Sequence, residues 1–262
     1  TLSAAFNHAI KKHKWQIGNP CSKAEKPKNP KGRTRYLTHT EVSTLLRVSE
    51  VPVDPTGKPL TSQFKSPVLR DFIELALNTG CRKGELLNLK WEHVDFSARL
   101  LYLETTKSGN TQTVSINEAA RQVLVRRLRL RADVCPDTPW VFFHITPTRN
   151  TEIGDRVKDV RKAFSTACRR AGVENFRIHD LRHTFASSLV REGVPLYVVS
   201  KLLRHSSIQM TERYAHLAPD HLHDAVANLG FSTQFQHTEK PTLAMDYQNG
   251  LVTVINGRGE RI

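Results

Sequence analysis

The sequence has 262 residues, of which 39% are hydrophobic, so it can bury one large core or two unequal ones. Its formal net charge of +14 favours nucleic acid as a partner, because a basic surface attracts phosphates. No membrane-length apolar run or signal peptide is visible, and the four cysteines follow neither zinc-site nor disulfide spacing, so we expect a protein of the reducing cytoplasm.

The N-terminal residues predict a helix followed by a linker. Leu2, Ala5, Phe6 and Ala9 are spaced for one helical face. Because the chain enters this pattern at once, we expect residues 1–17 to be the last helix of a truncated upstream DNA-binding domain. Residues 18–35 are rich in Pro, Gly and Lys, which is typical of an extended, solvated linker. Its basic residues, including Arg33 and Arg35, are candidate DNA contacts.

Residues 36–228 are expected to form one mainly helical α+β domain with a small antiparallel sheet. Thr38 and Glu41 have the spacing of a capping box, and Ser66-Pro67 begins a second helix that Gly80 ends. Residues 99–104 and 111–116 read as two strands joined by turn residues. They predict a β-hairpin with Lys107 near its tip.

The second half of this domain is predicted to be helical. A basic helix, capped by Asn117, runs to about residue 132, and its arginines either follow DNA phosphates or form a solvated face. Further helices are predicted over 155–171, 180–192, 195–204 and 207–215, with a shorter one from Pro219. Residues 229–262 form a polar tail with one strand-like run, 250–255.

Several local patterns carry groups suited to phosphate chemistry. His179, Arg182 and His183 share one helical face. Arg82 follows a glycine-flanked turn at a helix N-terminus, where free N–H groups can bind an anion. Glu85, one turn later, can orient a basic neighbour. Each pattern alone is also typical of a solvated surface.

Tyr214 stands out among the five tyrosines because Arg213 and His216 flank it. Tyr197, by contrast, lies beside Val198 and is predicted to be a core residue. A phenol has a pKa of about 10, so it becomes a good nucleophile only where a cationic pocket favours the phenolate. Tyr214 is therefore the candidate nucleophile.

These motifs, in this order, resemble the tyrosine recombinases, or phage integrase family, over residues 36–228. The matching segments are T-G-C-R-K-G-E-L, T-K-S-G, H-D-L-R-H, L-L-R-H-S-S and R-Y-A-H. The chain departs from the family in two places. Arg204 stands where the family usually has glycine before its second histidine. The second hairpin strand, 112–116, lacks the usual Arg and V-P-L.

The resemblance implies a site-specific recombinase of a prophage or mobile element, with the catalytic-domain fold of that family. Tyr214 attacks the scissile phosphate, leaving a 3′-phosphotyrosyl link and a free 5′-hydroxyl. Lys107 protonates the leaving oxygen, His179 takes or relays the tyrosine proton, and Glu85 positions a basic neighbour. The remaining implied residues are Arg82, Arg182 and His205 for the phosphate oxygens, and Arg204 and Arg213 for DNA.

No metal, other cofactor or ATP is required by this chemistry, because guanidinium and imidazole groups stabilise the charge. The implied partners are double-stranded DNA at attachment sites, further copies of the chain as a dimer or tetramer on DNA, and accessory DNA-bending factors. Two alternatives stay open: a topoisomerase-like DNA relaxer with the same chemistry, and a catalytically silent DNA-binding module.

Overall fold

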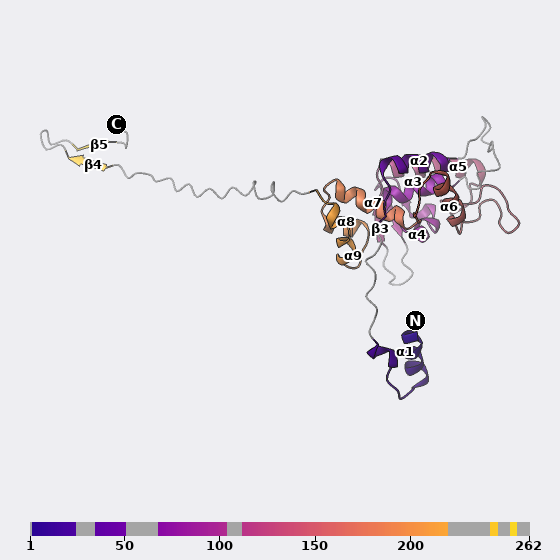
Figure 1. The fold of residues 1–262 in the computed structure, drawn as a ribbon. Coiled ribbons are helices and arrows are strands. Elements are labelled where there is room, and N and C mark those ends of the chain that lie inside the picture. The colour runs from indigo at the N-terminus through magenta and orange to yellow at the C-terminus, as the bar shows by residue number, and fades with distance from the viewer. Residues whose placement is uncertain are drawn as a thin grey trace. The chain divides into compact units, whose positions relative to one another are not determined.

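The computed structural model describes residues 2–24, 35–50, 68–103 and 112–219, and the backbone of two short strands near the C-terminus. The chain divides into two units, Thr1–Pro219 and Asp220–Ile262. In the second unit, β4 (Thr242–Met245) pairs with β5 (Val252–Ile255) in antiparallel register (Figure 1). The strand predicted at 250–255 is therefore confirmed over four residues, whereas β4 was not predicted. The predicted domain boundaries stay predictions.

The N-terminal segment consists of α1 (Leu2–His13) and the short 3-10 helix η1 (Pro20–Lys23). The predicted first helix is confirmed. The prediction of an extended linker from residue 18 was wrong at η1, because Asn19 caps that turn. Its side-chain oxygen accepts a hydrogen bond from the Cys21 N–H (2.9 Å), and its amide nitrogen donates to the Ser3 carbonyl (3.1 Å).

Two helices open the large helical body. In α2 (His39–Ser49), the Thr38 hydroxyl accepts from the Glu41 N–H (3.2 Å), and the Glu41 carboxylate accepts from the Thr38 N–H (2.8 Å). The predicted capping box is thus confirmed. The second helix, α3 (Leu69–Thr79), ends at Gly80 as predicted, and Gly80 has a left-handed φ of 61°. Its predicted start at residues 66 and 67 lies outside the described residues.

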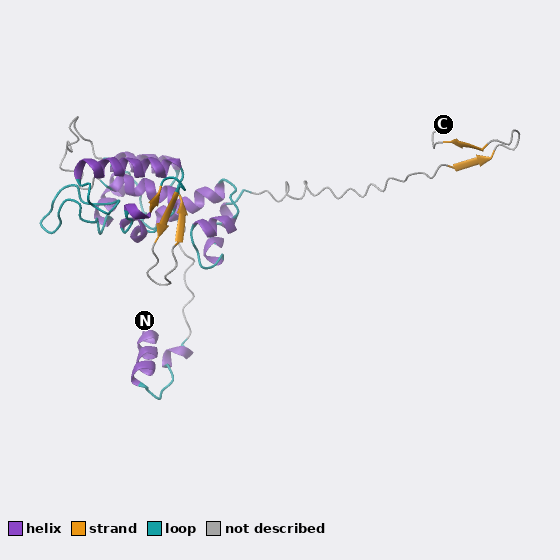
Figure 2. Ribbon diagram, turned by 180° about the vertical axis from the view of Figure 1, so that it is seen from behind, coloured by secondary structure: helices purple, strands orange, loops and turns teal. Residues whose placement is uncertain are grey.

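A three-stranded antiparallel sheet lies beside these helices (Figure 2). The 3-10 turn η2 (Trp91–His93) leads into β1 (Val94–Asp95), which pairs with β2 (Leu100–Leu103), and β2 pairs with β3 (Gln112–Ser115). Alternate residues face the core, where Leu101 is opposite Val114 and both are buried. The two strands of the predicted hairpin are confirmed. Its tip, with Lys107, lies outside the described residues.

The basic helix α5 (Glu118–Val134) begins at Asn117 as predicted. Its arginines, however, are mostly engaged within the protein. Arg126 bridges Asp71 (3.0 Å) and Glu74 (2.6 Å) of α3, and Arg127 is fully buried against Phe142 and Phe143. Neither predicted interpretation of this helix, a row of phosphate contacts or a solvated face, describes these two arginines.

The later helices are shorter than predicted. They are α6 (Arg161–Arg170), α7 (Asp180–Arg191), α8 (Leu196–Leu202) and α9 (Gln209–Glu212), followed by the 3-10 turn η3 (Ala215–Leu217). The prediction that α6 begins at residue 155 was wrong. Residues 155–157 are extended instead. The Val157 N–H donates to the Phe142 carbonyl (3.0 Å), and the His144 N–H donates to the Asp155 carbonyl (2.8 Å). The helix predicted from Pro219 lies outside the described residues.

Helix α7 connects two apolar clusters. Leu181 belongs to the large core formed with α2, α3, α5 and α6. Ala186 and Val190 belong to a smaller cluster with Val199 of α8 and the ring of Tyr214. Tyr197 was wrongly predicted to be core. It is 64% exposed, with the Lys201 ammonium 5.2 Å from its ring. No helix that the structure describes has the length and apolar character needed to cross a bilayer.

We predict that Gly80→Ala destabilises the protein. A Cβ there would lie 2.5 Å from a ring carbon of Phe185, and the left-handed backbone alone disfavours an L side chain by about 1–2 kcal/mol. Urea unfolding should show at least that loss. The matched control is Gly84→Ala in α4 (Lys83–Leu87), where an added Cβ has no neighbour within 4 Å. Equal stability of the two variants would contradict the prediction.

Candidate active site

Arg182, on the first turn of α7, lies at the centre of the site. Only 3% of the residue is exposed. One guanidinium nitrogen donates to the carbonyl of Gly80 (2.6 Å), and the other donates to the carbonyl of Leu203. These carbonyls lie at the ends of α3 and α8, where a helix leaves acceptors unpaired and carries partial negative charge. Arg182 therefore joins two helix ends that are far apart in the sequence.

Arg82 and Arg204 share the carboxylate of Glu85. The Arg82 side chain donates to Oε1 of Glu85 (2.7 Å). The Arg82 backbone N–H (2.8 Å) and the side chain of Arg204 (2.6 Å), which follows α8, both donate to Oε2. Burial alone would raise the pKa of Glu85, but the charge of Arg204 and the hydrogen bonds from Arg82 outweigh it and lower the pKa. The predicted role of Glu85 in orienting a basic neighbour agrees with this geometry. The Arg82 N–H, however, is occupied and is not open to an anion.

Arg204 occupies a demanding position. Its φ of 55° lies in the left-handed region that glycine adopts readily, and its side chain is only 6% exposed. The chain's departure from the family's usual glycine therefore falls on a residue with a glycine-like backbone. Since the guanidinium is buried against Glu85, the predicted contact of Arg204 with DNA is not supported.

His205 follows directly and is held by Thr211. Its Nδ1 lies 2.8 Å from the Thr211 hydroxyl, and Thr211 is completely buried. Burial, together with the charges of Arg182 and Arg82, lowers the pKa of His205 to about 4. The ring is therefore neutral at neutral pH. If the hydroxyl donates to Nδ1, the ring proton lies on Nε2, ready to donate to an acceptor.

Tyr214 lies between α9 and η3, inside the predicted helix 207–215, which the structure breaks into these two pieces. Only 1% of the residue is exposed, and its hydroxyl is hydrogen-bonded to Nδ1 of His183. Burial raises the pKa of Tyr214 to about 12, although Arg213 and Arg182 favour the phenolate. The phenol is thus protonated at neutral pH, and the cationic neighbours do not by themselves outweigh burial.

His183 and His179 are neighbours with different surroundings. The two rings meet edge to face, with centroids 5.1 Å apart, but His183 is 8% exposed whereas His179 is exposed. Burial and the nearby His179 lower the pKa of His183 to about 4, which leaves it neutral. Among the described residues, the Tyr214 hydroxyl is hydrogen-bonded to His183 and not to His179.

Electrostatic interactions connect these groups into one site, which we name the Arg182 cluster. The charge of Arg82 lowers the pKa of Arg182 and of His205, and the charge of Arg213 lowers that of Tyr214. Burial and the neighbouring cations lower the pKa of Arg182 to about 10, so it stays charged at neutral pH. The members of the Arg182 cluster are Arg82, Glu85, Arg182, His183, Arg204, His205 and Tyr214.

Two other predicted site residues, Lys107 and Arg33, are outside the described residues. Arg35 pairs with Glu41 (3.2 Å from Nη1 to Oε2), and its guanidinium lies 5.7 Å from the Phe176 ring centroid. Its contact with DNA stays a prediction.

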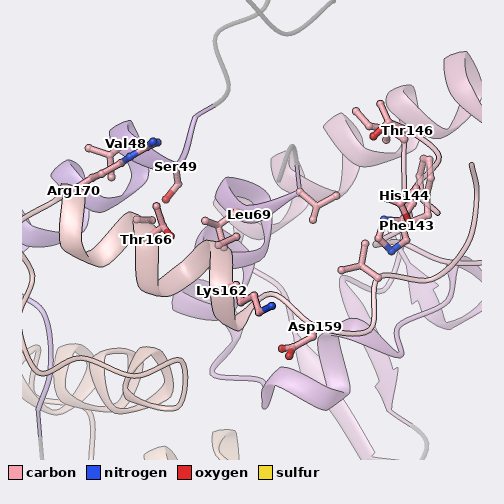
Figure 3. Close-up of a pocket in the computed structure, with 16 residues that line it drawn as sticks. Val48, Ser49, Leu69, Phe143, His144, Thr146, Asp159, Lys162, Thr166 and Arg170 are labelled. Atoms are coloured by element: carbon pink, nitrogen blue, oxygen red, sulfur yellow. The ribbon is translucent and has the colours of Figure 1, made fainter. Parts of the chain in front are cut away.

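A cavity of about 800 Å³ lies between the end of α2, the start of α3 and α6 (Figure 3). In this view Arg170 lies near Val48 on one side of it, Phe143, His144 and Thr146 lie on the opposite side, and Lys162 and Asp159 lie between them. No described member of the Arg182 cluster lines this cavity.

Comparison with known proteins decides the family. Residues 35–221 match the phage integrase family. The chain belongs to this family. The match includes the Arg182 cluster and the predicted position of Lys107, so the resemblance read from the motifs is confirmed.

Individual integrases and their structures agree with this assignment. The integrase of Salmonella phage P22 is 33% identical over 229 residues, which cover 84% of this chain and 53% of that protein. The catalytic domain of bacteriophage HP1 integrase is 27% identical with a TM-score of 0.52, and the match covers 76% of this chain and 96% of that one. The structure of the Tn1549 transposon integrase in complex with transposon right end DNA has a TM-score of 0.60 at 20% identity. The match covers 87% of this chain and 76% of that one, and it shows that the two share a fold. The predicted α+β fold is confirmed, and the chain spans about half the length of the P22 integrase.

Sequence reasoning did not select two residues that contact the predicted site residues. His183 was placed on the same helical face as Arg182, but no role was assigned to it. Thr211 carried no signal, because a threonine among polar residues is common on a surface. Their roles depend on which side chains the fold brings against Tyr214 and His205.

We predict that Glu85→Gln destabilises this integrase-family domain by about 3 kcal/mol, because it leaves the buried Arg204 cation without its counterion. Urea unfolding measures the loss. Because the folded pKa of Glu85 lies below its usual value of 4.5, the contribution is complete above that pH and is lost as the pH falls through the folded pKa.

The matched control adds Arg204→Gly to Glu85→Gln. The double variant should be more stable than Glu85→Gln alone, because the unpaired cation is gone and glycine fits the left-handed backbone. The Arg204→Gly single variant is measured as well. If the stability loss of the double variant equals the sum of the losses of Glu85→Gln and Arg204→Gly, the pairing is contradicted.

Proposed function

We propose that this protein is a site-specific DNA recombinase that cleaves and rejoins strands through a 3′-phosphotyrosyl intermediate. One observation carries the proposal. The charges of Arg82 and Arg182, from separate parts of the chain, act on His205, and the charge of Arg182 also acts on the buried phenol of Tyr214. Two guanidinium groups, an imidazole and a hydroxyl that are coupled in this way suit nucleophilic attack on a phosphodiester.

The proposed roles follow from the charge that develops in the reaction. In the pentavalent transition state, negative charge gathers on the nonbridging phosphate oxygens. Arg182 is held in place by two carbonyl groups, and Arg82 by Glu85, so both are preorganised donors. Such donors typically contribute several kcal/mol each to transition-state stabilisation. Nε2 of His205 supplies a third donor where Thr211 fixes the ring.

Cleavage requires two further proton transfers. Lys107 on the β2–β3 hairpin is proposed to protonate the leaving 5′-oxygen, as the family resemblance implies. The family resemblance implies that His179 takes or relays the tyrosine proton. Arg213 and the basic residues Arg33 and Arg35 are proposed to contact DNA phosphates, and this contribution should weaken as salt increases.

The proposed partners are double-stranded DNA at an attachment site and further copies of the chain. The net charge of +14 supports a polyanionic partner. The Tn1549 integrase, which has a similar fold, was solved in complex with DNA. Self-association on DNA, accessory DNA-bending factors and action in the cytoplasm of a host bacterium are proposed from family resemblance.

A nicked duplex that carries an attachment site tests the function. Wild-type protein should become covalently attached to the DNA, because the short fragment beyond the nick diffuses away before religation. Tyr214→Phe should form no adduct. The matched control is Tyr197→Phe, since Tyr197 is the far more exposed tyrosine and should be dispensable.

The outcomes separate the alternatives. An adduct with Tyr214→Phe, or its loss with Tyr197→Phe, would contradict the assigned nucleophile. Relaxation of supercoiled plasmid without sequence dependence would indicate a topoisomerase-like activity. Tight DNA binding with no adduct on any substrate would indicate a catalytically silent module.

A further inference from the structure

The hydroxyl of Tyr214 has one hydrogen-bond partner among the described side chains, and that partner is His183. The hydroxyl oxygen is hydrogen-bonded to the ring nitrogen Nδ1, and the two ring centroids are 5.8 Å apart. In the proposed reaction this oxygen is the atom that attacks phosphorus. His183 therefore contacts the reacting atom itself.

Both partners are fixed before any substrate binds. The Tyr214 ring packs with Ala186, Val190 and Leu203 in the smaller apolar cluster. His183 lies within α7 and is 8% exposed, so helix and burial both restrict its ring. A donor and acceptor held in this way lose little freedom when a proton moves between them.

The ionisation states define the donor and the acceptor, but the order of the two pKa values keeps the proton on the phenol until its oxygen bonds to phosphorus. The pKa of His183, lowered to about 4 by burial and by His179, leaves a free lone pair on the imidazole, whereas Tyr214 is protonated. The pair then consists of a neutral acceptor and a neutral donor. With Nδ1 as the acceptor, the ring proton of His183 lies on Nε2.

We propose that His183 is a catalytic residue that accepts the phenolic proton of Tyr214 as the phosphotyrosyl bond forms, an inference that rests on the proposed recombinase function. The bond from the Tyr214 oxygen to phosphorus forms, the O–H bond breaks, and its proton goes to Nδ1. The bond from phosphorus to the 5′-oxygen breaks, and that oxygen takes a proton from Lys107. On rejoining, the 5′-hydroxyl attacks phosphorus and gives its proton back to Lys107, the bond from phosphorus to the Tyr214 oxygen breaks, and the His183 imidazolium returns its proton to the departing phenolate.

One of the groups around His183 favours the imidazolium. The charged or titratable groups that act on it are His179, Asp180, Arg182 and Arg213. Of these, the Asp180 carboxylate favours the protonated ring, and it is held by the Arg177 N–H (2.8 Å). A bound phosphate adds negative charge beside the cations that oppose protonation of His183. It should therefore raise the pKa of His183 at the step in which Tyr214 attacks phosphorus.

The first experiment compares His183→Asn with wild type on the nicked duplex. The asparagine oxygen can replace Nδ1 as a hydrogen-bond acceptor, but it cannot take up a proton. Adduct formation should fall by about 100-fold or more, as for loss of a general base, while DNA binding in a gel-shift assay is unchanged. His39→Asn, an exposed histidine at the start of α2, is the matched control. Cleavage by His183→Asn at the wild-type rate would overturn the proposal.

The second experiment separates the attacking oxygen from the leaving group. A substrate with sulfur at the scissile 5′-bridging position has a leaving group that needs no proton. It should restore cleavage by Lys107→Ala but not by His183→Asn. Restoration of His183→Asn would place His183 at the leaving group and overturn the proposal.

If His183→Asn is found unfolded by its thermal melt, His183→Gly with added imidazole gives the answer. Imidazole should restore adduct formation in proportion to its neutral form, and a failure to restore it in folded protein would overturn the proposal. The result with wild-type protein separates a failure of the recombinase function from a failure of the role proposed for His183. Without a wild-type adduct the recombinase function itself fails, whereas a normal adduct and an unaffected His183 variant overturn only the role of His183.

Discussion

The two hydrogen bonds from Arg182 to backbone carbonyls hold the site together. They join the end of α3, in the large core, to the end of α8, in the smaller cluster. Burying a guanidinium is unfavourable unless its donors are satisfied, and helix ends supply both acceptors and partial negative charge. The cation that organises these helix ends is also a proposed phosphate ligand. Stability and catalysis are therefore coupled at this residue.

Tyr214 shows how packing and reactivity oppose each other. Its ring fills the smaller apolar cluster, which fixes the hydroxyl but raises its pKa to about 12. A cationic neighbourhood was expected to favour the phenolate, yet burial dominates in the protein alone. Attack then depends on transferring the proton during the reaction rather than on a preformed phenolate. The neutral His183 against that hydroxyl is placed for this transfer.

Glu85 explains how three nearby arginines are tolerated. Its carboxylate neutralises part of the charge of Arg82 and Arg204, and the charge of Arg204 in turn keeps Glu85 ionised. Arg204 has a backbone conformation suited to glycine, so this chain combines some backbone strain with an added ion pair. Arg82 is the most exposed of the group at 44% of its side chain, and it remains accessible to a phosphate.

The sequence by itself determined the family, the main helices and the set of candidate residues. Capping residues such as Thr38 and Asn117, and the ordered motifs around Arg82 and Tyr214, are local signals that a chain carries before it folds. Tertiary structure alone decided that Tyr197 is exposed, that Arg204 turns inward to Glu85, and that His183 contacts Tyr214. These outcomes depend on contacts between residues far apart in the chain. Periodicity can place a side chain on a helical face, but only packing determines what that face meets.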